Sequence, residues 1–213
     1  MFSSTSAKNP SPNTGPERAD FERRRRSGRR QAMLVMAICA APVVAAWLAF
    51  FVFPPGKLMN YGELIEARSL PDTALPLLDG KPFRLSEMKG RWVMLQVDSG
   101  ACPEACQIKL YQMRQVRLTQ GREMDRIERV WLIDDAAQLD TTVMRAFDGT
   151  RMVRAAGSPL LGQFPVPSPG GLRRDHIYLV DPLGNLMMRF PKDADPSRIK
   201  KDIERLLRVS RIG

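Results

Sequence analysis

The chain has very few side chains that could bind a soft metal ion. Its 213 residues include only three cysteines and one histidine. This scarcity excludes a disulfide-rich scaffold and an array of zinc fingers, which both need many more of these residues. The sequence also lacks internal repeats, a phosphate-binding glycine loop, a dinucleotide fingerprint and a Ser-His-Asp order. Any thiol or soft-metal chemistry must therefore be carried by very few residues.

The composition excludes several further classes of protein. A hydrophobic share of 44% is too high for a mainly disordered chain, and 26% charged residues are too many for a multi-span membrane protein. The net charge of +10 is concentrated at the two ends of the chain: residues 1–31 hold eight basic and three acidic side chains, and residues 184–213 hold eight and four. A nucleic-acid-binding protein carries its basic residues on a folded surface. We therefore expect no nucleic-acid partner.

A hydrophobic run follows the largest arginine cluster. Residues 32–53 contain no charged side chain, and a helix of that length covers the ~30 Å hydrocarbon core of a bilayer. No small-residue cleavage site ends the run, which favours an uncleaved transmembrane anchor over a signal peptide. Arginines 23–26, 29 and 30 precede the run and only Lys57 follows soon after. The positive-inside rule then predicts a cytoplasmic N-terminus and an outward-facing C-terminal domain, most simply at a bacterial inner membrane with the domain in the periplasm.

The sequence therefore divides into four parts. Residues 1–31 are expected to be a disordered basic cytoplasmic tail, and residues 32–53 the single transmembrane anchor. Residues 54–71 are expected to be a linker with one short helical turn near residues 62–67. Residues 72–213 are expected to fold as the soluble domain.

The soluble part alternates apolar runs with amphipathic segments. Residues 91–97 and 129–133 are short apolar runs typical of strands buried on both faces, and residues 106–122 have helical spacing. The other expected elements are a hairpin at 75–83, a helix at 141–147, strands at 177–180 and 186–190, and a closing helix at 196–209. This order predicts an α/β fold with a central mixed sheet flanked by helices.

Two cysteines lie where an open α/β sheet usually places its functional site, just past the end of a buried strand. If Pro103 begins a helix, Cys102 caps it and Cys106 lies one turn later on the same face, with the β-carbons ~5–6 Å apart. Such a pair could bind one soft metal ion. It could instead close a disulfide after local unwinding, because a disulfide needs β-carbons ~3.8 Å apart. Two inert buried cysteines are the third interpretation, which an oxidising compartment disfavours.

The single histidine, His176, begins a late strand. If that strand pairs beside the first buried strand, the imidazole could reach the cysteine loop. Cys102, Cys106 and His176 would then form a set of two sulfurs and one nitrogen, which suits Cu(I), and also Cu(II) if one oxygen ligand is added. The third cysteine, Cys39, lies inside the membrane run and is best explained as a small apolar packing residue.

Three segments together resemble one known family. Cys102 and Cys106 enclose Pro-Glu-Ala after an apolar strand, Asp134 and Asp135 end the next strand, and the segment from Asp175 to Gly184 reads DHIYLVDPLG. In this pattern the chain is similar to the Sco/SenC family over roughly residues 75–207, and it shares the single anchor. It differs from the family pattern in carrying a glutamine in place of the proline after the second cysteine.

The resemblance implies a thioredoxin-like fold and one bound copper ion, with Cys102, Cys106 and His176 as ligands. It implies a membrane-anchored metallochaperone that matures the copper site of cytochrome c oxidase and acts on the copper-receiving subunit of that respiratory oxidase. A first alternative is a periplasmic thiol:disulfide reductase that uses Cys102 and Cys106 as its catalytic redox pair without metal. A second alternative is a non-catalytic docking factor for oxidase assembly. His176 separates the first two functions, since only copper binding needs it.

Overall fold

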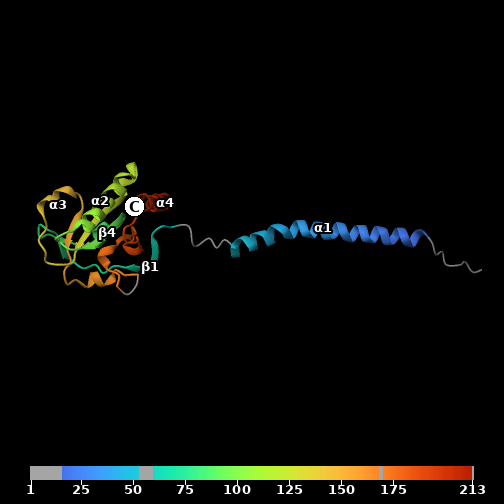
Figure 1. Cartoon of the computed structure of the whole chain (residues 1–213), viewed down its shortest axis with the longest axis horizontal. Helices are drawn as coiled ribbons and strands as arrows, with labels where there is room; N and C mark the ends of the chain where they lie inside the picture. Colours follow the sequence, from blue (N-terminus) through green and yellow to red (C-terminus); the bar gives the residue numbers. More distant parts are fainter. Residues whose placement is uncertain (1–15, 53–59, 168–169, 213) are drawn as a thin grey trace, which may run out of the picture. The chain divides into compact units, whose positions relative to one another are not determined.

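The computed structural model describes residues 16–52, 60–167 and 170–212 of the chain. The chain divides into two units, one up to Lys57 and one from Leu58 to Gly213 (Figure 1).

The first unit is one helix, α1, which spans Pro16–Val52. Its segment Arg30–Ala49 has a mean hydropathy of 2.3 and no buried residues, and is long and apolar enough to cross a membrane. The helix begins well before the uncharged run, so residues 16–31, expected to be disordered, are helical. Proline is favourable in the first turn of a helix, and the Glu, Arg and Ala residues that follow have high helix propensity. The rest of the predicted tail, residues 1–15, lies outside the described residues.

The second unit is built on a six-stranded mixed sheet with the strand order β1-β8-β7-β4-β5-β6. Strands β4, β5 and β6 are parallel, whereas β7 runs antiparallel to β4, and β8 antiparallel to both β7 and β1. The strands are β1 (Glu63–Ser69), β4 (Trp92–Asp98), β5 (Ile127–Ile133), β6 (Arg151–Arg154), β7 (Ile177–Val180) and β8 (Asn185–Arg189). The helices are α2 (Glu104–Leu118), α3 (Thr141–Ala146) and α4 (Pro196–Val209). Strands β2 (Leu75–Pro76) and β3 (Pro82–Phe83) form a small separate hairpin. Four 3-10 turns complete the described part of the unit: η1 (Leu85–Met88), η2 (Gly121–Arg126), η3 (Pro159–Gln163) and η4 (Arg173–Asp175).

The sheet has a hydrophobic core on each face, because side chains alternate along each strand. Met94 and Trp131 point to the face that α2 and α4 cover, and they belong to the same buried hydrophobic cluster as Ile203 of α4. Leu95 and Tyr178 point to the opposite face. The predicted central mixed sheet flanked by helices is therefore confirmed, and the condition that a late strand lies beside the first buried strand is met, because β7 pairs with β4.

Residues 63–69 correct one expectation. They were expected to lie in a linker with a helical turn, but they form the edge strand β1, which pairs with β8. The carboxylate of Asp202 in α4 accepts hydrogen bonds from the backbone N–H groups of Tyr61 and Gly62, both at 2.8 Å. The start of β1 is thus held by residues far away in the sequence, which the local pattern does not show.

Candidate functional site

A disulfide joins Cys102 and Cys106 at the junction of β4 and α2. Helix α2 begins at Glu104, with Pro103 as its N-cap. Cys102 therefore lies outside the helix, and its φ of 40° is in the left-handed region. This is the local unwinding that the disulfide alternative required, and it brings the two α-carbons to 5.1 Å. Both cysteines are buried, with 1% and 0% of their surface exposed.

The loop before Cys102 is fixed against the segment that follows β5. The Gly100 N–H donates to Oδ1 of Asp135 at 2.9 Å, and the Cys102 N–H donates to the Ser99 carbonyl at 3.1 Å. A β-carbon on Gly100 would lie 2.4 Å from the carbonyl oxygen of Ala137, so only glycine allows this approach. The position of Cys102 therefore depends on contacts between two separate loops.

Arg174 joins a third segment to the same place. Its guanidinium donates two hydrogen bonds to Asp134, at 2.9 and 2.6 Å, and contacts Asp135 at 3.2 Å. Burial raises the pKa of Asp135, but hydrogen bonds from Ser99 and from the Gly100 N–H, together with the Arg174 charge, outweigh it and hold that pKa below its ordinary value. Arg174 therefore ties both carboxylates to a third segment beside the cysteine loop.

A buried ion pair lies beneath the loop and was missed in the sequence. The Lys109 ammonium contacts Oδ2 of Asp98 at 2.6 Å and also donates to the Arg174 carbonyl. Asp98 and Lys109 have only 3% and 9% of their surface exposed. One signal was available, since Lys109 lies on the inward side of α2, between Cys106 and the buried Met113. A charged residue at such a position needs a buried partner.

His176 lies at the expected end of the sheet but on the other face. Ile177, the next residue, pairs with Gln96, and both point to the face of Cys106. Alternation therefore turns His176 toward Tyr178, with ring centroids 6.1 Å apart. Its Nδ1–H donates to the Phe190 carbonyl at 2.9 Å, because a carbonyl can only accept. Burial lowers the pKa of His176, and the hydrogen bond to Phe190 opposes that shift only in part.

The structure thus brings Cys102 and Cys106 together and leaves His176 apart from them. Among the side chains that the structure describes, no three or more from His, Cys, Asp or Glu residues form a group that could hold a metal ion. The oxidised pair offers no thiolate. Once reduced, it offers two soft sulfur donors and a pair of thiols for exchange.

Comparison with known proteins supports the fold. A family model described as "transmembrane-like, thioredoxin-like, C-terminal domain" matches residues 92–210. No curated protein matches the chain.

Many solved structures are similar to it, including three Sco proteins. Apo Sco1 from Thermus thermophilus has 18% identity and a TM-score of 0.53, covering 71% of this chain and 99% of that one. Yeast Sco1 with copper bound has 12% identity and a TM-score of 0.54, and the match covers 68% of this chain and 96% of that one. Arabidopsis thaliana ScoI with copper bound has 15% identity and a TM-score of 0.53, and the match covers 67% of this chain and 100% of that one. At these identities the likeness shows the fold.

Proposed function

We propose that this chain, which belongs to the family of transmembrane-like, thioredoxin-like C-terminal domains, is a membrane-anchored, Sco-like protein whose Cys102–Cys106 pair undergoes thiol–disulfide exchange. The observation that carries the proposal is the disulfide itself, which closes across the loop between β4 and α2, where Cys102 has a left-handed backbone conformation. In the reduced pair, one thiolate attacks a client disulfide and forms a mixed disulfide. The second sulfur then displaces the client, which leaves with two electrons and two protons as a dithiol.

The two sulfurs differ in their surroundings, and this assigns their roles. Cys106 is part of α2, and its sulfur contacts Gln96 inside the core. Cys102 precedes the helix in a loop and follows Ala101, which is exposed. Cys102 is therefore the attacking sulfur and Cys106 the resolving one. Because both cysteines are buried in the disulfide form, the loop 99–103 must move for a client to reach Cys102.

The first prediction tests this cycle in the purified full chain. Under native conditions dithiothreitol should reduce the pair, and alkylation followed by mass spectrometry should count two new thiols. Cys102→Ser should leave Cys106 unable to form the intramolecular disulfide, whereas Cys39→Ser should leave the cycle unchanged. A native wild-type chain that resists reduction while the denatured chain is reduced would mean that the disulfide is only structural.

Localisation forms part of the proposal. The apolar segment Arg30–Ala49 supports an anchor, and the arginines before it with few basic residues after it support a cytoplasmic N-terminus. The domain then lies on the periplasmic side of a bacterial inner membrane, where disulfides persist. A reporter that is active only in the periplasm, fused after the last residue, should be active. Activity of a cytoplasm-specific reporter in the same place would contradict this topology.

Copper binding is the second candidate function, and copper would be cargo rather than a resident cofactor. It is favoured by the donor chemistry: two sulfurs four residues apart suit Cu(I), and the Sco proteins of yeast and Arabidopsis thaliana were solved with copper bound. Cys102, Cys106 and His176 would hold one ion for the copper-receiving subunit of a respiratory oxidase. This requires reduction of the disulfide. It also requires rotation of His176. Because Nδ1 of His176 is hydrogen-bonded to the Phe190 carbonyl, Nε2 is the nitrogen that could bind copper.

Metal analysis separates the two candidates. After anaerobic reduction and dialysis against Cu(I), the wild-type chain should retain about one copper ion, and Cys102→Ser or Cys106→Ser should abolish tight binding. His176→Ala should weaken binding by more than the ~10–100-fold typical of changes outside the ligand set. Unchanged copper affinity in His176→Ala would exclude His176 as a ligand. A chain that neither cycles nor binds copper would leave the docking factor as the remaining function.

A further inference from the structure

We infer that Gln96 shifts the redox equilibrium of the Cys102–Cys106 pair toward the reduced form. Gln96 acts as a positioning residue, since it contacts the resolving sulfur and takes no part in bond exchange. The inference rests on the proposed thiol–disulfide function and assigns the regulation of that same site.

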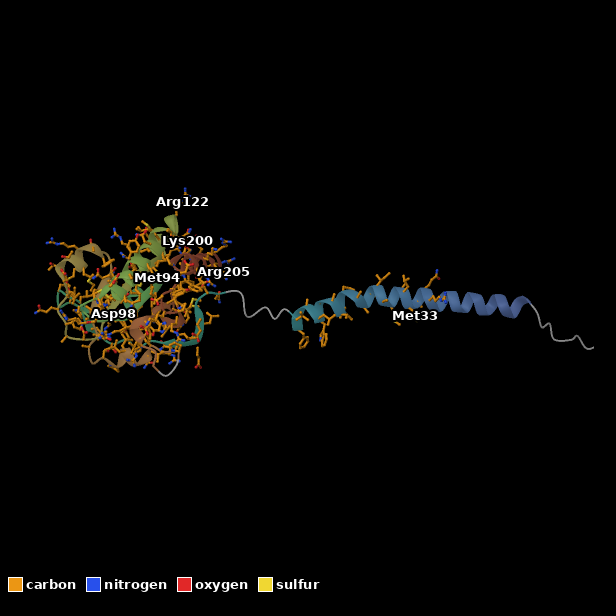
Figure 2. All side chains as sticks on the ribbon, viewed as in Figure 1. Met33, Met94, Asp98, Arg122, Lys200 and Arg205 are labelled. Carbon is orange, nitrogen blue, oxygen red and sulfur yellow. A yellow bond between two sulfur atoms is a disulfide. The ribbon has the colours of Figure 1, made fainter. Side chains whose placement is uncertain are left out.

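Gln96 is a polar residue in an apolar place. It lies in β4 between Leu95 and Val97, and its side chain is completely buried on the α2 face of the sheet. Figure 2 labels Met94 and Asp98, the residues two positions before and after it on the same strand. Its Nε2 donates to Sγ of Cys106 at 3.4 Å.

The other end of the Gln96 amide is unsatisfied in the disulfide form. Its Oε1 is buried, and among the residues that the structure describes no group donates a hydrogen bond to it. A buried carbonyl oxygen without a donor costs free energy, and a sulfur in a disulfide can supply no proton. In the oxidised protein, Gln96 therefore has a buried polar atom without a hydrogen-bond partner in the described part of the chain. An apolar side chain at this position, such as methionine or leucine, would have no such atom.

Reduction supplies the missing partner. When a dithiol reductant transfers two electrons and two protons to the disulfide, each sulfur becomes a thiol, and the reductant becomes a disulfide. The new S–H of Cys106 lies beside the Gln96 amide and can donate to Oε1. If Cys106 loses that proton, its thiolate accepts a charge-assisted hydrogen bond from Nε2. The thiol form thus gains a hydrogen bond to Oε1 that the disulfide lacks, and in the thiolate form the existing bond from Nε2 becomes charge-assisted and stronger. Both effects raise the reduction potential of the pair.

The test compares the wild-type chain with Gln96→Leu and Gln96→Met. Both variants remove the amide, and methionine keeps the length of the side chain. In equilibrium with reduced and oxidised dithiothreitol, the variant disulfide should be about tenfold harder to reduce, which corresponds to about 30 mV. The control is Gln112→Leu, which removes an α2 amide that bonds the Ala194 carbonyl and should leave the equilibrium unchanged.

A second measurement does not depend on cycling. In a Cys39→Ser/Cys102→Ser background, Cys106 is the single cysteine of the chain, and ultraviolet thiolate absorbance reports its titration. Loss of the Nε2 donor should move that titration to higher pH in Gln96→Leu and Gln96→Met, while circular dichroism confirms that the fold is kept. Unchanged equilibrium and titration in both variants would overturn the inference. A wild-type chain that cannot be reduced, combined with a titration shifted by Gln96→Leu, would overturn the proposed cycle and uphold the contact.

Discussion

Replacing Asp98 by asparagine is expected to lower the free energy of unfolding by about 3–5 kcal/mol, because it leaves the charge of Lys109 buried without its partner. The pair is short, at 2.6 Å, and almost inaccessible to solvent. Asp98 also ends β4, and its Oδ1 accepts from the Ser99 N–H at the start of the cysteine loop. The loss should appear as a lower urea midpoint and as a looser loop around Cys102.

Two further variants make this expectation specific. Glu204→Gln removes the exposed i,i+4 pair with Lys200, at 3.2 Å, and should cost no more than about 0.5 kcal/mol. The double variant Asp98→Leu/Lys109→Met replaces both charges by apolar groups, and it should recover much of the stability lost in Asp98→Asn. Equal urea midpoints for Asp98→Asn and Glu204→Gln would show that the buried pair contributes nothing to stability.

The elements that were predicted correctly are those whose own residues, by their hydrophobicity or by helix start signals, indicate the structure. Strands β4 and β5 lie in the middle of the sheet with helices or loops over both faces, so most of their residues are apolar. Helix α4 carries its start signals locally, since Asp195 accepts from the Ser197 N–H at the N-cap and Pro196 follows in the first turn. Such elements can be recognised without any tertiary information.

The two strands that were missed depend on distant partners, whereas the missed part of helix α1 does not. Strand β1 lies at the edge of the sheet, where most of its side chains are exposed, so it has no apolar alternation to reveal it. Strand β6 has only four residues, with arginine at both ends, and its pairing with β5 is what makes it a strand. Helix α1 extends beyond the membrane run because helix propensity does not end where hydrophobicity ends.

The site was predictable in part for the same reason. The cysteine pair and its possible unwinding follow from five consecutive residues, whereas the orientation of His176 follows from the register of β7 on β4. In a strand the next residue points the other way, so a shift of one position decides whether an imidazole faces the sulfurs. The contacts of Lys109 and Gln96 arise from the packing of α2 on β4, which the local sequence pattern does not contain.

Replacing Gly100 by alanine is expected to damage both stability and the geometry of the redox pair. The new β-carbon would lie 2.4 Å from the Ala137 carbonyl oxygen, and a backbone atom cannot move aside as cheaply as a flexible side chain. One of the two loops must shift, which breaks the hydrogen bond from Gly100 to Asp135, and overpacking of this kind costs about 1–3 kcal/mol. Because Cys102 follows two residues later, the disulfide should also form less readily, which alkylation at fixed dithiothreitol ratios would measure. The matched control is Gly162→Ala, where a β-carbon meets no atom within 4 Å, and equal effects of the two substitutions would refute the role of this close approach.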